Sequence, residues 1–232
     1  MGPKRALSCA PKAAKGSLPR LLLTRPRAQA EGFALKVREK TSLTPIIAPM
    51  QDIRDLNVSL NLSGISALAF TSINGVEAFA RMSSIRLPAY CVGEATATRA
   101  RALGFSATSA AGTADDLALI LPQSGVLHLH GQHVRQVLSN NHLAIYSQAA
   151  LPLSDKCQAL LATNSLDAVA LFSPRSAALL AEFLPKNPSP RLVLYTLSES
   201  VAAALPNGLS LRVCAEPSAT SMLRLLSADF PA

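Results

Sequence analysis

Short apolar segments alternate with helical patterns along this chain from residue 20 to its C-terminal end. Residues 65–71 (ISALAFT) precede a helical pattern that starts near Ser72, and residues 167–172 (DAVALF) precede one that starts near Ser173. Strands that are separated by helices of this length must cross over and pair in parallel. The alternation therefore predicts an α/β fold with parallel sheets.

The same pattern recurs elsewhere in the chain. Further strands are expected at residues 20–24, 44–50, 88–92, 126–130, 143–149, 191–195 and 211–215. Helices are expected between most of them, including a short one within 131–140 and one that ends near Leu205. Neither half of the 232-residue chain supplies the strands for a long doubly wound sheet, so two small three-layer domains are expected.

Local signals indicate where several of these elements begin. Thr113 is followed three residues later by Asp116, which is close to a capping box. Ser154 and Ser218 are expected to cap the helices that follow them. The strand at 44–50 has proline at both sides, which favours an edge strand or a connector.

The composition limits the kinds of protein that this chain can be. Apolar residues make up 49% of it and charged residues 16%, as in globular proteins. The net charge is +8, but five of the 22 basic residues lie in residues 1–20, which hold no acid. The remainder has 17 basic and 14 acidic residues, so nucleic-acid binding is not expected. Residues 1–19 are expected to form a disordered basic tail; a targeting segment or a misassigned start would explain the same composition.

No apolar segment approaches the roughly 18–20 residues that a membrane span requires, so no membrane association is expected. The cysteines show no CxxC spacing and are expected to be free thiols in a reducing compartment, which favours the cytoplasm. They are Cys9, Cys91, Cys157 and Cys214.

Three histidines lie close together in the sequence: His128, His130 and His133. Three imidazoles could bind zinc. However, no Cys, Asp or Glu lies nearby to complete the set, and Gly131 interrupts the geometry. No metal site is therefore expected.

Small and hydroxyl-bearing residues follow the expected strands, where ligands bind in parallel α/β sheets. Each turn also starts a helix, whose free N–H groups and partial positive charge favour carboxylates. The candidates are Thr71, Ser72, Asn74, Gly75, Gly93, Thr96, Ser173, Pro174, Ser176, Ser198 and Ser200. Ordinary N-capping is the alternative function of each one. Their number at corresponding positions predicts that several face one cleft and bind a ligand with many carboxylates.

Seven segments, in order, resemble those of the uroporphyrinogen-III synthase family, the cofactor-free cyclases of tetrapyrrole biosynthesis. The most specific match is AFTSINGVEAFA at 69–80, which looks like the family's FTS-x-NGV segment. The others are LLLTRPRAQAEGFA, PAYCVGEATATRARALGF, GTADDLALIL, AIYSQAALP, LFSPRSAALLAEF and AEPSATSMLRLL. The chain departs from the family pattern at Leu197, where a glycine is common, and at His130, where bacterial relatives often have arginine.

The resemblance implies a discontinuous architecture. Residues 20–43 and 150–232 would form the first α/β domain, and residues 50–142 the second. Residues 44–49 and 143–149 would be connecting strands that form a two-stranded hinge.

The resemblance also implies a reaction. The substrate would be hydroxymethylbilane, a linear tetrapyrrole with acetate and propionate arms. Loss of its hydroxyl gives an azafulvene, and closure with inversion of ring D through a spiro intermediate gives uroporphyrinogen III, whereas the unassisted reaction gives the type I isomer. Catalysis would depend on positioning and preorganised dipoles, without a metal or other cofactor.

Tyr146 matches the family's hinge tyrosine and is the expected hydrogen-bond donor or acid for the departing hydroxyl. Packing between the domains is the alternative function of this side chain. Arg25 and Arg175 are the expected charged partners of the substrate, and Gly131 is a further expected binding residue. The protein is expected to act as a monomer. The alternative function is that of a non-catalytic, two-lobed binding protein for a small polycarboxylate or another anion.

Overall fold

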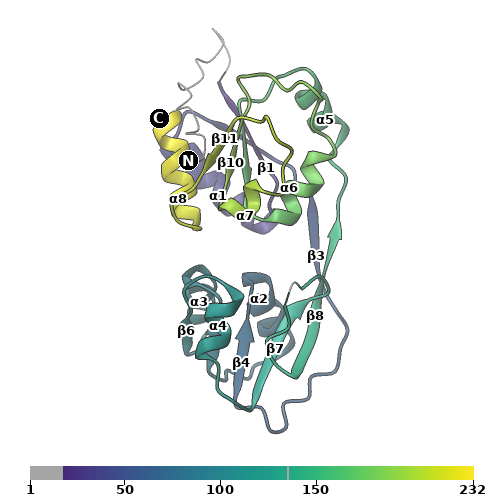
Figure 1. Ribbon diagram of the computed structural model, residues 1–232, viewed down its shortest axis with the longest axis vertical. Coiled ribbons are helices and arrows are strands. Elements are labelled where there is room, and N and C mark those ends of the chain that lie inside the picture. The colour runs from purple at the N-terminus through teal and green to yellow at the C-terminus, as the bar shows by residue number, and fades with distance from the viewer. Residues whose placement is uncertain (1–17, 135) are drawn as a thin grey trace, which may run out of the picture. The chain divides into compact units, whose positions relative to one another are not determined.

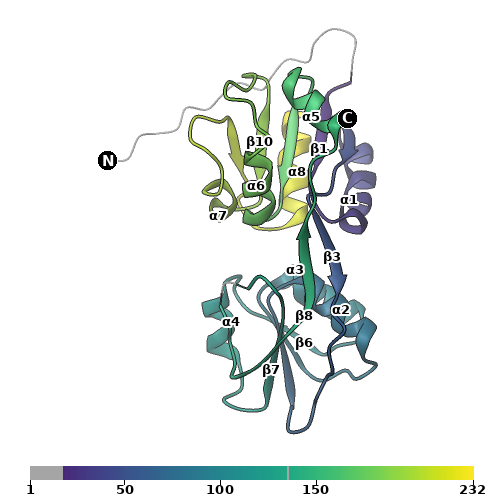
Figure 2. The ribbon, with the colours of Figure 1, turned by 90° about the vertical axis from the view of Figure 1, so that its right-hand side faces the viewer.

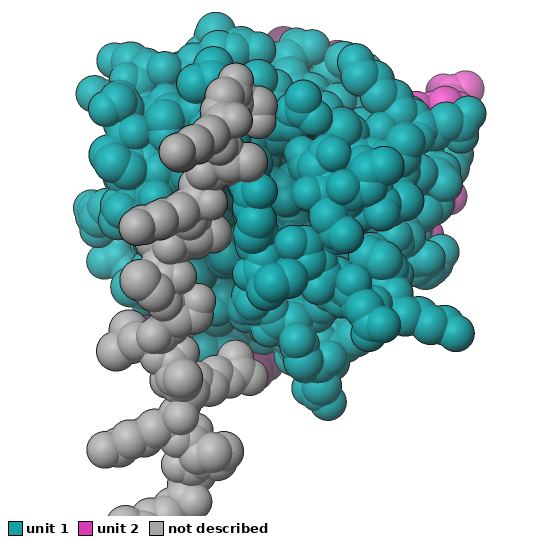
Figure 3. Space-filling view, turned by 90° about the horizontal axis from the view of Figure 1, so that it is seen from above, with its two compact units in different colours: residues 1–51, 150–232 teal, residues 52–149 magenta. Residues whose placement is uncertain are grey.

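The computed structural model describes residues 18–134 and 136–232 of the chain (Figure 1). The expected tail at 1–19 therefore lies almost wholly outside the described residues. The chain divides into two compact units, coloured separately in Figure 3. Unit 1 consists of two segments, one that ends at Gln51 and one that spans Ala150–Ala232. Unit 2 is the single segment Asp52–Ala149 between them in the sequence. Each unit has its own sheet, and the predicted α/β class with parallel sheets is confirmed.

Unit 1 is built on a five-stranded sheet in the order β11-β10-β9-β1-β2, and all of its neighbours pair in parallel. Its strands are β1 (Arg20–Leu23), β2 (Thr44–Ile47), β9 (Ala168–Leu171), β10 (Val193–Thr196) and β11 (Leu211–Val213). The proline-flanked segment forms β2 at the edge of this sheet, as its sequence predicted. The parallel pairing brings the carboxyl ends of all these strands to one edge of the sheet.

Helices cover both faces of this sheet (Figure 2). They are α1 (Arg27–Lys40), α5 (Asp155–Ala162), α6 (Pro174–Ala181), α7 (Glu199–Ala202) and α8 (Ala219–Asp229). Leu21 and Leu23 of β1 pack in the core with α1 and α8, whereas Leu22 packs in the opposite core with α5 and α6. Successive side chains of a strand point to opposite faces, so an entirely apolar strand requires two covering layers.

Unit 2 is built on a six-stranded sheet in the order β3-β8-β7-β4-β5-β6. Its strands are β3 (Gln51–Asp55), β4 (Ala67–Phe70), β5 (Ala89–Cys91), β6 (Ala107–Ser109), β7 (Val126–Gly131) and β8 (Asn141–Ala150). All pairs from β8 to β6 are parallel. The chain passes between the units at the start of β3 and at the end of β8.

Three helices complete unit 2: α2 (Ile73–Met82), α3 (Glu94–Ala102) and α4 (Ala114–Ile120). Helices α2 and α3 bury one face of the sheet around the rings of Phe70, Phe79 and Phe105. The centroids of these rings lie 6.0–6.2 Å apart. No helix among the described residues is long and apolar enough to span a membrane.

All three predicted helix starts are confirmed, and two of the three have a side-chain capping bond. Thr113 and Asp116 form a capping box, with Asp116 N donating to Thr113 Oγ1 at 3.1 Å and Thr113 N donating to Asp116 Oδ2 at 3.0 Å. Ser218 accepts from Ser221 N at 3.0 Å. Ser154 is the N-cap residue of α5, as predicted, but its side chain makes no capping hydrogen bond.

The helix predicted within 131–140 is absent from the described part of this segment. The segment is bound to the sheet instead, because Leu138 N donates to His128 Nδ1 at 3.2 Å and Ser139 Oγ donates to Val126 O at 2.8 Å. The helix predicted to reach Leu205 ends earlier, since α7 covers only four residues. Pro206 disfavours helical backbone at the residue before it.

Strand β3 has no counterpart among the predicted elements. Its sequence, QDIRD, is mostly charged and polar and lacks an alternating apolar pattern. Strand β2, expected as part of a connector, lies within the sheet of unit 1.

Candidate active site

Tyr146 of β8 lies at the centre of the most compact group of expected site residues in unit 2. Its side chain is buried, with 2% of its surface exposed. The pairing of β7 with β8 shifts by one residue between His130 and Gly131, and this bulge places Gly131 opposite Tyr146. Gln132 N then donates to Tyr146 O at 2.9 Å. The bulge therefore fixes the position of the Tyr146 backbone next to Gly131.

Gly131 lies directly against the tyrosine ring. A Cβ atom added to Gly131 would lie 2.6 Å from Tyr146 Cε2, 2.8 Å from Tyr146 Cζ and 2.8 Å from Gln148 Oε1. Carbon atoms that are not bonded to each other do not approach so closely. Only glycine leaves the space that this ring occupies.

Gly75 lies against another edge of the same ring. A Cβ atom here would lie 3.1 Å from Leu129 O and 3.7 Å from Tyr146 Cε1. The amide of Gly75 donates to Ser72 O at 3.1 Å within the first turn of α2. The glycine thus lets α2 approach the sheet, while its N–H group is already bonded inside the protein.

Ser72 is the N-cap residue of α2. Its Oγ accepts from Asn74 N at 3.1 Å, which caps the helix. The nearby Ser72 side chain and Gly131 backbone lower the pKa of the Tyr146 phenol. Burial raises this pKa more strongly, so that it lies above its ordinary value of 10.0. The hydroxyl therefore carries its proton at neutral pH and can donate it in a hydrogen bond.

The expected residues Gly93 and Thr96 follow strand β5, at the start of α3. Gly93 stands at the N-cap of α3, and no side chain of a described residue caps this helix. Thr96 is buried, and its amide donates to Gly93 O at 3.0 Å. The start of α3 therefore has first-turn amides that no capping side chain satisfies.

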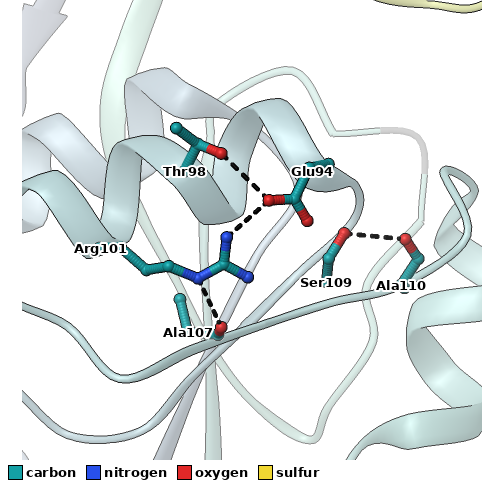
Figure 4. A network of polar contacts seen from close by, with 6 residues as sticks. All are labelled: Glu94, Thr98, Arg101, Ala107, Ser109 and Ala110. Atoms are coloured by element: carbon teal, nitrogen blue, oxygen red, sulfur yellow. Dashed lines mark hydrogen bonds and ion pairs between the residues drawn. The ribbon is translucent and has the colours of Figure 1, made fainter.

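Glu94 begins α3, and its carboxylate is turned along the helix (Figure 4). Its Oε1 accepts from Arg101 Nη1 at 2.6 Å and from Thr98 Oγ1 at 3.1 Å. The bond from Arg101 is the main cause that lowers the pKa of Glu94. Because Arg101 neutralises this carboxylate, a second carboxylate at the helix start would meet less repulsion.

In unit 1, Arg25 follows β1 at the carboxyl edge of the sheet. Its guanidinium carbon lies 4.1 Å from the ring centroid of Phe172, and its Nη2 donates to Gln29 Oε1 at 3.2 Å. Burial lowers the pKa of Arg25 to about 10, so the side chain stays charged at neutral pH. The aromatic ring and the amide hold a cation in a fixed place.

Three polar side chains meet beside Phe172, at the start of α6. Ser176 N donates to Ser173 Oγ at 3.1 Å, and Pro174 occupies the first helical position. Gln51 Nε2 donates to Ser176 Oγ at 2.7 Å, and the two serine hydroxyls are 3.0 Å apart. Gln51 was not among the predicted site residues. It lies 122–125 residues away from both serines, so no local pattern relates them.

The remaining expected residues are less closely grouped. Arg175 and Thr71 are half-buried, whereas Ser200 is exposed on α7, where its Oγ lies 3.0 Å from Ser198 Oγ. At the departure from the family pattern, the side chain of Leu197 packs against both hydrophobic cores of unit 1. It is therefore a partly buried side chain at the margin of both cores.

His128, His130 and His142 form a cluster, whereas the sequence placed His128, His130 and His133 close together. His133 is exposed, and His142 of β8 takes its place, with its Nδ1 3.1 Å from His130 Nε2. His130 Nδ1 lies 2.8 Å from Gly131 O and so carries a proton. Among the described residues, no group of three His, Cys, Asp or Glu side chains could hold a metal ion.

The family of this chain is indicated by its sequence and by its fold. A family model described as uroporphyrinogen-III synthase HemD matches residues 33–224. The crystal structure of uroporphyrinogen-III synthetase from Helicobacter pylori is similar, with a TM-score of 0.62 at 14% identity over 90% of this chain and 99% of that chain. A mutant uroporphyrinogen III synthase from the extremely thermophilic bacterium Thermus thermophilus has a TM-score of 0.56 at 18% identity over 91% of this chain and 98% of that chain.

No curated protein sequence is significantly similar to this chain. The likeness to the two solved structures concerns the fold, whereas the family model matches most of the sequence. The chain therefore belongs to the uroporphyrinogen-III synthase family, an enzyme family of heme biosynthesis that carries out a lyase-type cyclisation.

Proposed function

We propose that this protein converts hydroxymethylbilane into uroporphyrinogen III, with Tyr146 as its catalytic residue. The observation that carries this proposal is the buried, protonated Tyr146, whose ring packs against Gly131 at the carboxyl end of β7. A donor held in a buried site stabilises a leaving oxygen better than water does, because it needs no reorganisation during the reaction.

The step assigned to Tyr146 is the departure of the substrate's hydroxyl. The carbon–oxygen bond breaks, the pyrrole nitrogen of the same ring gives up its proton, and the leaving hydroxyl takes up a proton, so that one water leaves. The azafulvene remains and closes through the spiro intermediate with inversion of ring D. Since Tyr146 keeps its proton at neutral pH, it donates a hydrogen bond to the leaving oxygen as negative charge develops there.

The substrate's acetate and propionate arms are assigned to the carboxyl edges of the two sheets. Arg25 supports this assignment, because it is charged and held in place by Phe172. The start of α3 supports it as well, because no described side chain caps this helix. Arg175 and the residues at the start of α6 are proposed as further contacts.

The finer circumstances of the reaction belong to the same proposal. The described cysteines Cys91, Cys157 and Cys214 are buried and free, which suits the reducing cytoplasm. The protein is proposed to act there as a monomer, with a small-molecule substrate and without nucleic acid.

Product analysis tests this function. Hydroxymethylbilane generated enzymatically is incubated with the full chain or with buffer, and the oxidised products are separated into type I and type III isomers. The type III isomer is expected to predominate only with the protein. A ratio equal to that in buffer would reject the enzyme, and saturable substrate binding with that ratio would favour the anion-binding protein.

A further inference from the structure

We propose that His130 and His142 are positioning residues, which hold the bulge beside Tyr146 through a directed chain of two hydrogen bonds. The chain runs from His142 Nδ1 to His130 Nε2, and from His130 Nδ1 to the carbonyl oxygen of Gly131. All four residues lie in unit 2. The effect of this chain on turnover rests on the proposed function, whereas the bonds themselves do not.

The strand geometry brings the histidines together. His128 and His130 are two residues apart on β7, so both side chains point to the same face of the sheet, and His142 of β8 pairs with His128. The ring centroids of His128 and His130 lie 5.0 Å apart, and those of His130 and His142 lie 5.4 Å apart. His142 is exposed and His130 is buried. The chain of bonds therefore leads from the surface of unit 2 to its interior.

The carbonyl group of Gly131 fixes the proton of His130. A carbonyl oxygen can only accept, so His130 Nδ1, which lies 2.8 Å from it, carries the proton. In a neutral imidazole the other nitrogen, Nε2, is then an acceptor. His142 Nδ1 lies 3.1 Å from this nitrogen and is therefore the donor. Both histidines thus have their proton on Nδ1.

His128 has the opposite tautomer. Its Nδ1 accepts from Leu138 N at 3.2 Å, so its proton is on Nε2. Neutral His128 thus has no ring nitrogen left to accept from His130. This directs the proton of His130 to Gly131 O.

The peptide unit between Gly131 and Gln132 is held from both of its ends. Its carbonyl oxygen accepts from His130 Nδ1, and its N–H group donates to Tyr146 O at 2.9 Å. Because a peptide unit is planar, the bond at one end restricts rotation at the other. The bulge interrupts the regular ladder at this point, so the side chain of His130 supplies a restraint where the pairing of β7 with β8 is irregular.

Rotation of this peptide would reach the tyrosine ring. Gly131 lies opposite Tyr146, and a Cβ atom added to it would lie 2.6 Å from Tyr146 Cε2. The backbone of the glycine therefore occupies the space next to the ring. His130 acts on the hydroxyl of Tyr146 only through this backbone, and His142 acts through His130.

The protonation of the ring nitrogens tests the chain in the unaltered protein. The sequence has four histidines, and long-range proton–nitrogen correlation after nitrogen-15 labelling shows which ring nitrogen of each one is protonated. At neutral pH, His130 and His142 are expected to carry the proton on Nδ1, and His128 on Nε2. A proton on Nε2 of His130 would overturn the inference, because the bond from His142 could then not form.

Replacement of His142 tests the first bond. His142→Phe keeps an aromatic ring beside His130 but removes the donor, so the Nε2 signal of His130 is expected to move to that of an unbonded acceptor. His142→Asn, whose amide nitrogen occupies the position of Nδ1, is expected to restore it. His133→Phe is the matched control, since His133 is exposed in the segment after β7, and it should leave both the signal and kcat unchanged. An unmoved His130 signal in His142→Phe would contradict the role of His142.

Two substitutions of His130 separate its two nitrogens. The amide nitrogen of asparagine occupies the position of Nδ1 and can donate to Gly131 O, whereas that of glutamine occupies the position of Nε2. His130→Gln is therefore expected to lower kcat for type III product roughly 10-fold with KM nearly unchanged, by the loss of one oriented hydrogen bond. His130→Asn is expected to retain most of kcat. Equal losses in both variants would overturn the role assigned to the bond with Gly131.

The loss of turnover is expected to depend on the tyrosine hydroxyl. In the Tyr146→Phe background, His130→Gln should lower kcat little further, because both substitutions act at one group. Full additivity of the two losses would overturn the inference. If the wild-type protein fails the isomer test while its histidines have the expected protons, the proposed function is rejected and the chain is retained. Type III product together with a proton on His130 Nε2 would retain the function and reject the chain.

Discussion

At the scale of single residues, His128 is an ionisable group whose pKa is strongly altered by its surroundings. It is fully buried, and burial lowers its pKa to about 4, with His130 and His142 adding to the effect. Its Nδ1 accepts from Leu138 N, so the neutral form holds the backbone at Leu138 on the sheet. Protonation would remove this acceptor.

The expected consequence is a loss of stability in mild acid. Because the folded pKa is lower than the ordinary value of 6.5, the unfolded chain binds a proton that the folded chain does not. Stability is therefore complete above about pH 6.5 and is lost as the pH falls toward 4, by an amount approaching about 3 kcal/mol. Urea unfolding at several pH values measures it. His128→Asn, which keeps an acceptor for Leu138 N, should flatten the profile; an unchanged slope would contradict the assignment.

The planar guanidinium of Arg25 makes contacts that a lysine side chain could not make. Lysine keeps the charge but loses the flat contact with Phe172 and the bond to Gln29. Arg25→Lys is therefore expected to raise KM about 10-fold with kcat nearly unchanged, as for a contact made equally in the ground and transition states. Steady-state kinetics measure both values. A fall in kcat at constant KM would place Arg25 in the chemical step.

Sequence patterns predicted many of the candidate site residues but not the contacts that these residues make with one another. Tyr146 and Gly131 were expected at the site separately, and only the fold shows that they touch. Gln51 and His142 were missed because their partners are remote or lie on a neighbouring strand. Contacts of this kind leave no local signal in a single sequence.

At the scale of secondary-structure elements, two helical glycines differ in the space available for a side chain. Gly32 lies in α1 with open space around it, whereas Gly75 lies in α2 with Leu129 O 3.1 Å from an added Cβ. Glycine weakens a helix unless packing requires it. The cost is local in α1 and is offset by close packing in α2.

Alanine is therefore expected to have opposite effects at the two positions. Gly32→Ala should raise the free energy of unfolding by about 0.5–1 kcal/mol. Gly75→Ala should lower it by about 1–3 kcal/mol, because the helix must move away from the sheet. Denaturant unfolding of both variants measures the difference, and stabilisation by Gly75→Ala would show that the contact with β7 is not tight.

The elements themselves were largely predictable where burial on both faces imposes an apolar strand, as in β4, β7, β9 and β10. Strand β3 was missed because charged residues occupy it. The helix predicted at 131–140 does not form, because polar groups of this segment bond to the sheet and to α4 instead. In α4 the partner is Asp115, whose Oδ1 accepts from Gln136 Nε2 at 3.1 Å. Tertiary bonds replace the helical ones there.

At the scale of the whole molecule, the two units differ in their continuity along the chain. Unit 2 is a single segment, Asp52–Ala149, with its own core, whereas unit 1 needs segments from both sides of it. A continuous segment with its own core meets the requirements of an independent domain.

A fragment of residues 52–149 is therefore expected to fold alone and to unfold cooperatively. Circular dichroism during urea titration and protection of β7 amides from hydrogen exchange measure this. The fragment that ends at Gln51 should remain unfolded, because β1 then lacks β9 as a neighbour. A disordered 52–149 fragment would show that its stability depends on unit 1.

The central claim is that this fold directs ring closure to one isomer and that the Tyr146 hydroxyl takes part in it. The fraction of type III product, measured for the wild-type protein and for Tyr146→Phe at equal substrate, tests it most directly. The account predicts mostly type III isomer with the wild type and a rate lower by about 100-fold, with a rise in type I, for the folded variant. Type I product alone with the wild type, or an unchanged rate and ratio with the variant, would contradict it.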